Sequence, residues 1–495
     1  MTGTATRREW IGLAVIALPC LVYAMDLTVL TLALPAISAD LHPSSAQLLW
    51  IVDVYGFLVA GSLITMGTLG DRIGRRRLLL IGAAAFAVAS VLAAVSTSAT
   101  MLIVSRALLG IAGGTLAPST LSLISAMFRD PGERSRAVGI WVASFSLGAA
   151  IGPLVGGVLL ERFSWGSVFL PGVPVMVLLL AVGPRLLPEF REPGAGRLDV
   201  RSAALSLGAV LAAVYGLKHL AQDGAGLAPA LWIAAGAVLG GVFVRRQRRL
   251  ADPLIDLGLF RLPAFTAALA TNLLGFFAIF GVAVFVSQYL QSVLGFSPLA
   301  AGLWSVPEAL GYVVSSMLTP LLATRVRPAV LIVAGLLMGA LGLAVIAAVP
   351  GGLAPLVAGS VISSLGLGAV ATLATDLVVA AAPPERAGAA AAISETGSEL
   401  GGALGIAVLG SIATAVYRGL LGSGVPATAR DSLGGAVATS GGDTALLDAA
   451  RDAFTEGFHV AAFVAAAVLV VAAIVAAALL ARAGEPAGVP ACAPA

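Results

Sequence analysis

Residues 45–97 read SAQLLWIVDVYGFLVAGSLITMGTLGDRIGRRRLLLIGAAAFAVASVLAAVST, two apolar runs separated by a short basic turn. Each run, at 45–68 and 78–97, is long enough for an α-helix to cross a hydrocarbon core of about 30 Å. Runs of this length recur along the whole chain, and the short alternating segments typical of a β-barrel are absent. The stretch therefore predicts membrane-spanning helices joined by tight turns.

The composition of the whole chain agrees with this prediction. Hydrophobic residues make up 59% of the 495 residues, charged residues make up 11%, and the mean hydropathy is +1.02. A soluble domain carries about 25% charged residues, so this chain lacks the polar residues needed to cover a water-facing surface. We therefore expect an all-α polytopic membrane protein with lipid as its solvent.

Fourteen apolar runs bounded by charge, proline or glycine are predicted to span the membrane. The first run is too long for a signal peptide and contains Asp26, so we interpret it as a helix. An even number of spans places both termini on one side. The predicted spans are 11–34, 45–68, 78–97, 100–127, 137–160, 166–186, 202–221, 227–244, 264–290, 298–322, 328–349, 353–381, 388–416 and 457–481.

The distribution of basic residues sets the orientation. Of the 28 lysines and arginines, 22 fall in segments on the side of the termini, 5 fall on the other side, and Arg106 lies within a span. Cytoplasmic loops carry the excess of basic residues in membrane proteins. We therefore expect both termini in the cytoplasm of a bacterium, and the protein in its cytoplasmic (inner) membrane.

An internal repeat predicts two related halves. ERSRAVGIWVASFSLGAAIG begins at Glu133, and ERAGAAAAISETGSELGGALG begins at Glu385, 252 residues later. Chance similarity between helices rich in alanine and glycine is the alternative. The predicted domains are a six-helix bundle at 1–190, two inserted helices at 191–262, and a second six-helix bundle at 263–495 with an outer loop at about 417–456. In that loop, GGDTALLDAARDAF is interpreted as an amphipathic surface helix or as a solvated loop.

ISETGSELGG (393–402) places Glu395 and Glu399 one helical turn apart in an apolar run. A carboxylate at mid-bilayer costs roughly 2.5–3.5 kcal/mol on insertion scales, so such residues pair, face water or do chemistry. Two buried like charges disfavour double ionisation, which suits a proton carrier, and the charged form suits a cationic ligand. The first-half counterparts are Val142 and Ser146, so the repeat itself does not require acids here. The alternative is a pair neutralised by Arg106 or by hydrogen bonds.

Four further acids and one base lie within predicted spans. Asp26, in the middle of the first span, is a functional candidate, with a buried structural hydrogen bond as the alternative. Asp53 suits a structural or a functional role equally, and Glu308 and Asp376 are weaker candidates. Arg106 is expected to pair with an acid or to set its protonation, because an unpaired cation would repel cationic cargo.

GDRIGRRR (70–77) joins the second and third spans on the predicted inner side. Its glycines allow a tight turn, and its aspartate is expected to cap the following helix or to pair with an arginine across the interface between the halves. Ordinary cytoplasmic charge would explain the arginines but neither the aspartate nor the glycine spacing. The residues predicted to act in conformational switching are Gly70, Asp71, Arg72, Gly74, Arg75 and Arg76.

GAAIGPLVGG (148–157) places four glycines at the spacing that allows close helix contact. Pro153 is expected to kink this span. Packing alone would explain the glycines, and a hinge or seal between conformational states is the sharper interpretation. The four glycines are Gly148, Gly152, Gly156 and Gly157.

The sequence shows no pattern typical of an enzyme or of a metal site. His42, His219 and His459 are scattered, and Cys20 and Cys492 fit neither a disulfide framework nor a metal site. The chain has no phosphate-binding GxxxxGK[ST] loop, which argues against direct use of ATP, and no nucleophile–base motif. We expect no cofactor, with a proton gradient as the energy source.

Four motifs, in order, resemble those of the major facilitator superfamily, specifically its fourteen-helix drug:proton antiporter branch. GDRIGRRR resembles the signature between helices two and three, and LIVSRALLGIAGG resembles the fourth-helix motif whose arginine is tied to proton coupling, here Arg106. SLGAAIGPLVGG resembles the fifth-helix antiporter motif, and AMDLTVLTLALP resembles the first-helix motif of the branch. The resemblance covers about residues 10–482.

The likeness is greatest to exporters of quaternary ammonium compounds, ethidium and related lipophilic cations. It implies that Asp26, Asp53, Glu395 and Glu399 occupy acidic positions used for protons or cations. Some dication exporters carry an acid in the tenth helix where Tyr312 falls here. Glu308, one turn earlier, could substitute on the same face. The basic signature is also degraded in the second half, at ATRVRP (323–328).

The resemblance therefore implies a monomeric, proton-coupled exporter of lipophilic cations, in which two halves rock around a central cavity. Its partners would be small-molecule drugs, protons and the lipid bilayer, with no nucleic acid. An exporter of a self-made antibiotic or lipid, whose acids serve only protons, is the alternative. A nutrient symporter fits less well because of the fifth-helix motif, and a receptor that moves nothing fits less well because of the embedded acids.

Overall fold

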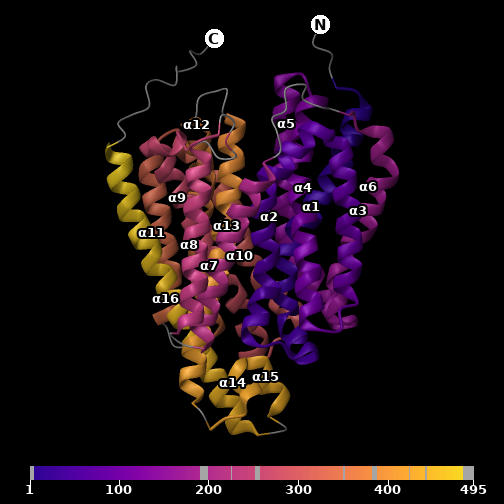
Figure 1. Cartoon of the computed structure of the whole chain (residues 1–495). Helices are drawn as coiled ribbons and strands as arrows, with labels where there is room; N and C mark the ends of the chain where they lie inside the picture. Colours follow the sequence, from indigo (N-terminus) through magenta and orange to yellow (C-terminus); the bar gives the residue numbers. More distant parts are fainter. Residues whose placement is uncertain are drawn as a thin grey trace.

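The computed structural model describes residues 5–189, 199–223, 226–250, 253, 257–348, 352–381, 387–422, 424–440 and 443–482. The regular elements in these residues are helices. Fourteen of them are long and apolar enough to cross a membrane (Figure 1). This number confirms the one predicted from the apolar runs.

Most of the spanning helices extend beyond the runs that predicted them. α1 and α2 begin at capping boxes, in which the Thr6 and Ser44 hydroxyls accept hydrogen bonds from the backbone of the first turn. The spanning helices are α1 Arg7–Leu41, α2 Ser45–Ile73, α3 Arg75–Ala94, α4 Ala99–Met127, α5 Pro131–Arg162, α6 Gly172–Leu186, α7 Val200–Asp223, α8 Leu227–Gln247, α9 Pro263–Gln288, α10 Pro298–Ala323, α11 Pro328–Ala348, α12 Leu353–Ala380, α13 Ala387–Leu421 and α16 Thr444–Arg482.

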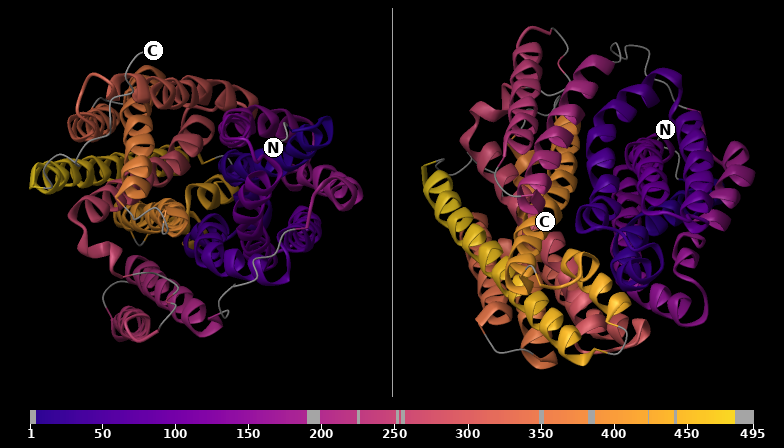
Figure 2. Two further views of the ribbon diagram at one scale, coloured as in Figure 1. Left: turned by 90° about the horizontal axis from the view of Figure 1, so that it is seen from above. Right: turned by 60° about the horizontal axis from the view of Figure 1, so that its bottom comes forward.

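Two helical bundles stand side by side (Figures 1 and 2). The larger part of one buried core lies in α1–α6, and the larger part of another lies in α9–α13 and α16. We call these bundles the N half and the C half. Helix α1 begins and α16 ends at the same end of the molecule, at the top of Figure 1. We call this end the terminal face and the other end the opposite face.

The two halves pack their equivalent helices in the same way. A Cβ added at Gly148 of α5 would lie 2.1 Å from the carbonyl oxygen of Leu21 on α1. A Cβ added at Gly401 of α13 would lie 2.3 Å from the carbonyl oxygen of Leu273 on α9. These positions correspond in the repeat, so the same glycine contact recurs in both halves. Residues 385 and 386, where the second repeat unit begins, lie outside the described residues.

The inserted helices α7 and α8 form a hairpin at the edge of the two bundles (Figure 2). Tyr215 of α7 packs against Trp50 of α2, with 6.3 Å between ring centroids, and α7 also contacts α13. The hairpin therefore touches both halves. Leu227, Leu231 and Val238 of α8 are exposed on its outer side, as expected for a surface that faces lipid. Residues 190–198, at the first predicted domain boundary, lie outside the described residues.

The segment at the opposite face differs from the predicted outer loop. The sequence GGDTALLDAARDAF was interpreted as a separate surface helix or a loop, but from Thr444 onward it forms the first turns of the long helix α16. Two short helices, α14 (Ala427–Asp431) and α15 (Leu433–Thr439), lie between α13 and α16 instead. The predicted outer segment 417–456 therefore contains the end of α13, two short helices and the first turns of α16.

Close contacts between the halves lie toward the opposite face. A Cβ added at Gly157 of α5 would lie 2.6 Å from Leu299 Cα, near the start of α10. One added at Gly410 of α13 would lie 2.4 Å from the Leu49 side chain, near the start of α2. The Ser287 hydroxyl of α9 donates to the carbonyl oxygen of Thr31 on α1 at 2.9 Å. These contacts join the halves on the side away from the termini.

Candidate functional site

A cavity of about 380 Å³ lies between the two halves. Its wall is mostly apolar and includes the aromatic rings of Phe145, Phe276 and Phe280. Both bundles contribute to the wall, through α1, α2, α4 and α5 on one side and α9, α10, α12 and α13 on the other. The charged and phenolic residues among the lining are Asp53, Arg106, Glu308, Tyr312 and Glu399. Five of the residues predicted from the sequence therefore meet at one cavity.

Arg106, which lines the cavity, forms a buried ion pair with Asp26. The Arg106 Nη1 atom lies 2.6 Å from the Asp26 Oδ2 atom, and both side chains are buried. The Arg106 Nε atom also donates to the carbonyl oxygen of Ile51, at 3.2 Å. The Arg106 guanidinium carbon lies 4.4 Å from the ring centroid of Tyr55, a cation–π contact. One arginine thus ties α1, α2 and α4 together, and its charge is compensated.

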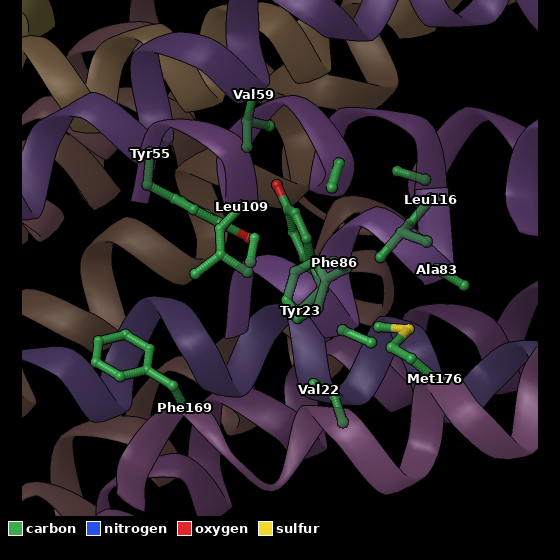
Figure 3. Packing of buried hydrophobic residues seen from close by; sticks show 14 of the residues in the cluster. Val22, Tyr23, Tyr55, Val59, Ala83, Phe86, Leu109, Leu116, Phe169 and Met176 are labelled. Carbon is green, nitrogen blue, oxygen red and sulfur yellow. The ribbon is translucent and has the colours of Figure 1, made fainter. Parts of the chain in front are cut away.

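Glu399 makes a hydrogen bond to the other half. The Tyr23 hydroxyl of α1 donates to the Glu399 Oε1 atom at 2.6 Å. Tyr23 is buried in the core of the N half, near Tyr55 and Leu109 (Figure 3). Of the two alternatives for these acids, neutralisation by Arg106 or by hydrogen bonds, the described structure has a hydrogen bond to Glu399, while Arg106 pairs with Asp26.

Glu395 and Glu399 occupy different environments although they share one helix face. Glu399 lines the cavity and is half-buried, whereas the Glu395 side chain is exposed. Glu395 lies one turn closer to the terminal face than Glu399, and the cavity lining does not include it.

The remaining predicted acids fall at three different places. Asp53 on α2 is buried and lines the cavity from the N half. Glu308 and Tyr312, one turn apart on α10, line it from the C half, as expected for two positions on one helix face. Asp376 is exposed near the end of α12, and the cavity lining does not include it.

The turn between α2 and α3 packs tightly within the N half. Gly74 has φ 108°, a conformation that favours glycine, and a Cβ added at Gly70 would lie 3.0 Å from Arg75 Cδ. Arg76 donates to the Leu187 carbonyl oxygen at 2.9 Å, next to the end of α6. Arg72 is exposed. The Asp71 side chain lies outside the described part of the structure, so both of its expected roles stay predictions.

The glycines of α5 face two different partners. Added Cβ atoms at Gly148, Gly152 and Gly156 would all lie within 2.3 Å of atoms of α1, whereas Gly157 faces α10 of the other half. Pro153 also contacts α10, because a Cβ added at Gly302 would lie 2.5 Å from its carbonyl oxygen. Helix α5 continues through Pro153 to Arg162. The motif therefore packs α5 within its half and also forms a contact between the halves.

Sequence reasoning missed two residues of the site, Tyr23 and Tyr55. Both are phenolic side chains in otherwise apolar spans, and the chain has only 6 tyrosines. Each lies within three residues of an embedded acid, Tyr23 before Asp26 and Tyr55 after Asp53. A tyrosine so close in sequence to an embedded acid was the signal that could have identified both residues. Among the described residues, there is no cluster of three or more histidine, cysteine, aspartate or glutamate side chains suited to a metal ion.

Comparisons with known proteins agree on one family. The family model described as Major Facilitator Superfamily matches residues 16–406. The multidrug efflux pump LfrA of Mycolicibacterium smegmatis is 46% identical over 471 residues, which are 92% of this chain and 93% of the relative. The methyl viologen resistance protein SmvA of Salmonella typhimurium is 35% identical over 465 residues, which are 90% of this chain and 93% of the relative.

A solved structure shows the same fold at low sequence identity. It is the crystal structure of a bacterial homologue of the human lysosomal transporter Spinster, in an inward-facing and unoccupied conformation. The TM-score is 0.73 at 18% identity, and the match covers 98% of this chain and 100% of the other. At this identity the likeness concerns the fold alone.

Proposed function

The chain belongs to the Major Facilitator Superfamily, and from this premise we propose that it exports lipophilic, mainly cationic compounds in exchange for protons. The observation that carries the proposal is the cavity between the halves, whose wall is apolar yet includes the carboxylates Asp53, Glu308 and Glu399. Apolar and aromatic surface suits lipophilic cargo, and carboxylates in such a wall suit a cation or a proton.

The charge balance of the C half supports a cation as the cargo. The sequence has no lysine or arginine at 262–324 or at 387–417. Glu308 therefore has no basic residue on its own helix, and the one on α13, Arg418, lies in its last turn and pairs with Asp431. A carboxylate in a low-dielectric wall is costly when charged and unpaired. Either a proton or a bound cation removes that cost, and the two compete for the same groups. Because a proton and a cation compete for the same carboxylates, the movement of one across the membrane is coupled to the movement of the other.

The names of the relatives point to the same class of cargo. LfrA is called a multidrug efflux pump, and SmvA is called a methyl viologen resistance protein. Methyl viologen is a planar organic dication, and its charge and its rings match the carboxylates and aromatic rings of this cavity. The presence of Glu308 one turn from Tyr312 supports the view that it replaces the tenth-helix acid of dication exporters.

The arrangement of the halves suggests how the cycle runs. The halves meet toward the opposite face, and Glu395 is exposed toward the terminal face. We place the terminal face in the cytoplasm of a bacterium, because 22 of the 28 basic residues lie on that side. Cargo then enters from the cytoplasm, the halves rock, and protons from outside displace it. Each proton that moves inward contributes about 2.3 kcal/mol per 100 mV of membrane potential.

Asp26 has a different part in this cycle from the acids of the C half. Its pairing with Arg106 compensates its charge in the described conformation, so we assign the direct exchange of proton and cation to the C-half acids. In this assignment, the Asp26–Arg106 pair holds α1, α2 and α4 in place against the C-half acids.

Ethidium accumulation in everted membrane vesicles tests the proposal. With an acidic lumen, wild-type protein should accumulate ethidium inside the vesicles, and Glu399→Gln should reduce the rate at least tenfold. Asp376→Asn, which removes an exposed acid outside the cavity, is the matched control and should transport as wild type does. Vesicles that hold the gradient and contain wild-type protein, yet accumulate neither ethidium nor methyl viologen, would contradict the proposal. Gradient-driven uptake of a neutral drug instead would favour acids that serve only protons.

A further inference from the structure

The hydrogen bond between Tyr23 and Glu399 joins the two halves near the middle of the membrane. Tyr23 lies 16 residues after the start of α1, and Glu399 lies 12 residues after the start of α13. The donor is buried in the N half, and the acceptor lines the cavity from the C half. The distance of 2.6 Å lies within the range of O–H···O hydrogen bonds. The contact therefore links a candidate exchange group to the packing of the other bundle.

The Tyr23 ring connects this bond to the Asp26–Arg106 pair. Its centroid lies 6.1 Å from that of Tyr55, and the Tyr55 ring carries the Arg106 guanidinium at 4.4 Å. Asp26 lies one turn after Tyr23 on α1. A Cβ added at Gly113 of α4 would lie 3.2 Å from the Tyr23 ring and 3.2 Å from the Tyr55 hydroxyl, so the glycine lets α4 approach both rings. A continuous chain of contacts therefore runs from Glu399 through the two tyrosine rings to the Asp26–Arg106 pair.

The two tyrosines differ in what their hydroxyls do. The Tyr23 hydroxyl donates to Glu399, whereas the Tyr55 hydroxyl has no hydrogen-bond partner among the described residues. Tyr55 acts through its ring, and Tyr23 acts through both its ring and its hydroxyl. The two side chains are therefore a matched pair for testing the hydroxyl alone.

Building on the proposed function, we propose that Tyr23 is the positioning residue through which the charge on Glu399 controls the relative position of the halves. An ionised Glu399 accepts a charge-assisted hydrogen bond from Tyr23, which stabilises the described conformation. Such a bond is roughly twice as strong as one between neutral groups. A proton or a bound cation on Glu399 weakens the bond and frees the C half to move. Cargo and proton thus act on the same contact.

Other groups near Glu399 do not provide this link. Helix α9, packed on α13, has no titratable side chain, and Asp376 of α12 lies near the terminal face. Tyr215 of α7 packs on Trp50 instead. Asp448, Arg451, Asp452, Glu456 and His459 of α16 lie toward the opposite face, and Arg482 is the last residue of the helix, at the terminal face. The charged and titratable groups that face Glu399 are Glu395 on α13, Tyr23 and Asp26 on α1, Asp53 and Tyr55 on α2, Arg106 on α4, and Glu308 and Tyr312 on α10.

Distance measurements between spin labels test the proposal without any transport. Labels at Arg129→Cys and Arg325→Cys, in a Cys492→Ser background, mark exposed loops of the N and C halves at the terminal face; Cys20 is buried. In wild type, the population with widely separated labels should fall as the pH is lowered from 8 to 5. In Tyr23→Phe, the ratio of separated to close populations at pH 8 should be at least tenfold lower, equivalent to about 1.4 kcal/mol. At pH 5 the ratio of separated to close populations in Tyr23→Phe should equal the ratio in wild type.

Two further variants separate this role from a structural one. Tyr55→Phe should keep the wild-type pH profile, because its hydroxyl makes no bond that would be lost. Glu399→Gln should give a smaller dependence on pH, and adding Tyr23→Phe to it should change little further. An unchanged pH profile in Tyr23→Phe, an equal loss in Tyr55→Phe, or a wild type insensitive to pH would overturn the proposal. Since no cargo is present, these results do not depend on the outcome of the ethidium experiment.

Discussion

The two halves of the molecule share their packing and differ in how they handle buried charge. In the N half, Asp26 is paired with Arg106, which also contacts the Ile51 carbonyl oxygen and the Tyr55 ring. In the C half, Glu308 and Glu399 line the cavity, and the one base on their two helices, Arg418, lies at the far end of α13 and pairs with Asp431. A compensated charge is a stable part of a scaffold, whereas an uncompensated one gains from binding a proton or a cation. The repeat thus supplies two similar scaffolds, and in the proposed function Glu308 and Glu399 of the second carry charge that a proton or a cation can neutralise.

The largest effect should follow from breaking the compensated pair. Asp26→Asn leaves the Arg106 charge buried and unpaired, which we expect to destabilise the protein by about 3–5 kcal/mol. Thermal unfolding of the purified protein in detergent measures this as a lower midpoint temperature. The double variant Asp26→Asn/Arg106→Met removes both charges and should recover most of the loss. If Asp26→Asn alone unfolds at the wild-type temperature, Arg106 does not depend on Asp26 for compensation.

The shared packing predicts a smaller effect that is equal in the two halves. Gly148→Ala and Gly401→Ala each place a Cβ within 2.3 Å of a backbone carbonyl oxygen on the neighbouring helix. Overpacking of this kind typically costs about 1–3 kcal/mol, and thermal unfolding should show similar losses for both variants. Gly241→Ala, on α8, is the control, because its Cβ would meet no atom within 4 Å. A lower midpoint temperature for only one of the two alanine variants would mean that the halves do not share this contact.

The smallest effect concerns an ion pair outside the membrane. Burial opposes ionisation of Asp199, but hydrogen bonds from Arg246 and Ser202 outweigh it and hold the Asp199 pKa below its usual range. The unfolded value is about 3.9, so the pair stabilises the fold above that pH and loses its contribution as the pH falls through the lower folded-state value. Both side chains are partly exposed, so Asp199→Asn should cost less than about 1 kcal/mol.

Thermal unfolding of Asp199→Asn at several pH values checks this last expectation. The difference from wild type should be present at pH 7 and should shrink progressively as the pH falls below about 3.9. Arg246→Gln should show the same loss at pH 7, and the double variant should add little to it. A difference that persists at low pH would show that the carboxylate charge is not its cause.

The features that lipid imposes could be predicted from the sequence, and the contacts between distant helices could not. The length and hydrophobicity of the spans gave fourteen helices, and the cost of burying charge marked Asp26, Arg106 and Glu399 as candidates. The partner of Arg106 could not be predicted, because several acids were available and only the packing of α1 on α4 selects Asp26. The Tyr23–Glu399 bond joins residues 376 positions apart, and no local pattern signals it.

The end of the chain shows a second limit of prediction. The stretch from Thr444 to Phe454 carries Asp448, Arg451 and Asp452, and this charge hid the start of a helix that continues into the membrane. Outside the hydrocarbon core, a helix can carry charged residues at little cost. Hydropathy therefore marks where a helix crosses lipid and says little about where it begins.

Proton release on cation binding tests the division between the halves most directly. Tetraphenylphosphonium would be added to purified protein in weakly buffered detergent solution, and the released protons measured with a pH indicator dye. Wild type should release protons, Glu399→Gln should release fewer, and Asp26→Asn/Arg106→Met should release as many as wild type. Release that persists in Glu399→Gln and disappears in the double variant would contradict the account, since it would place the exchangeable proton in the N half.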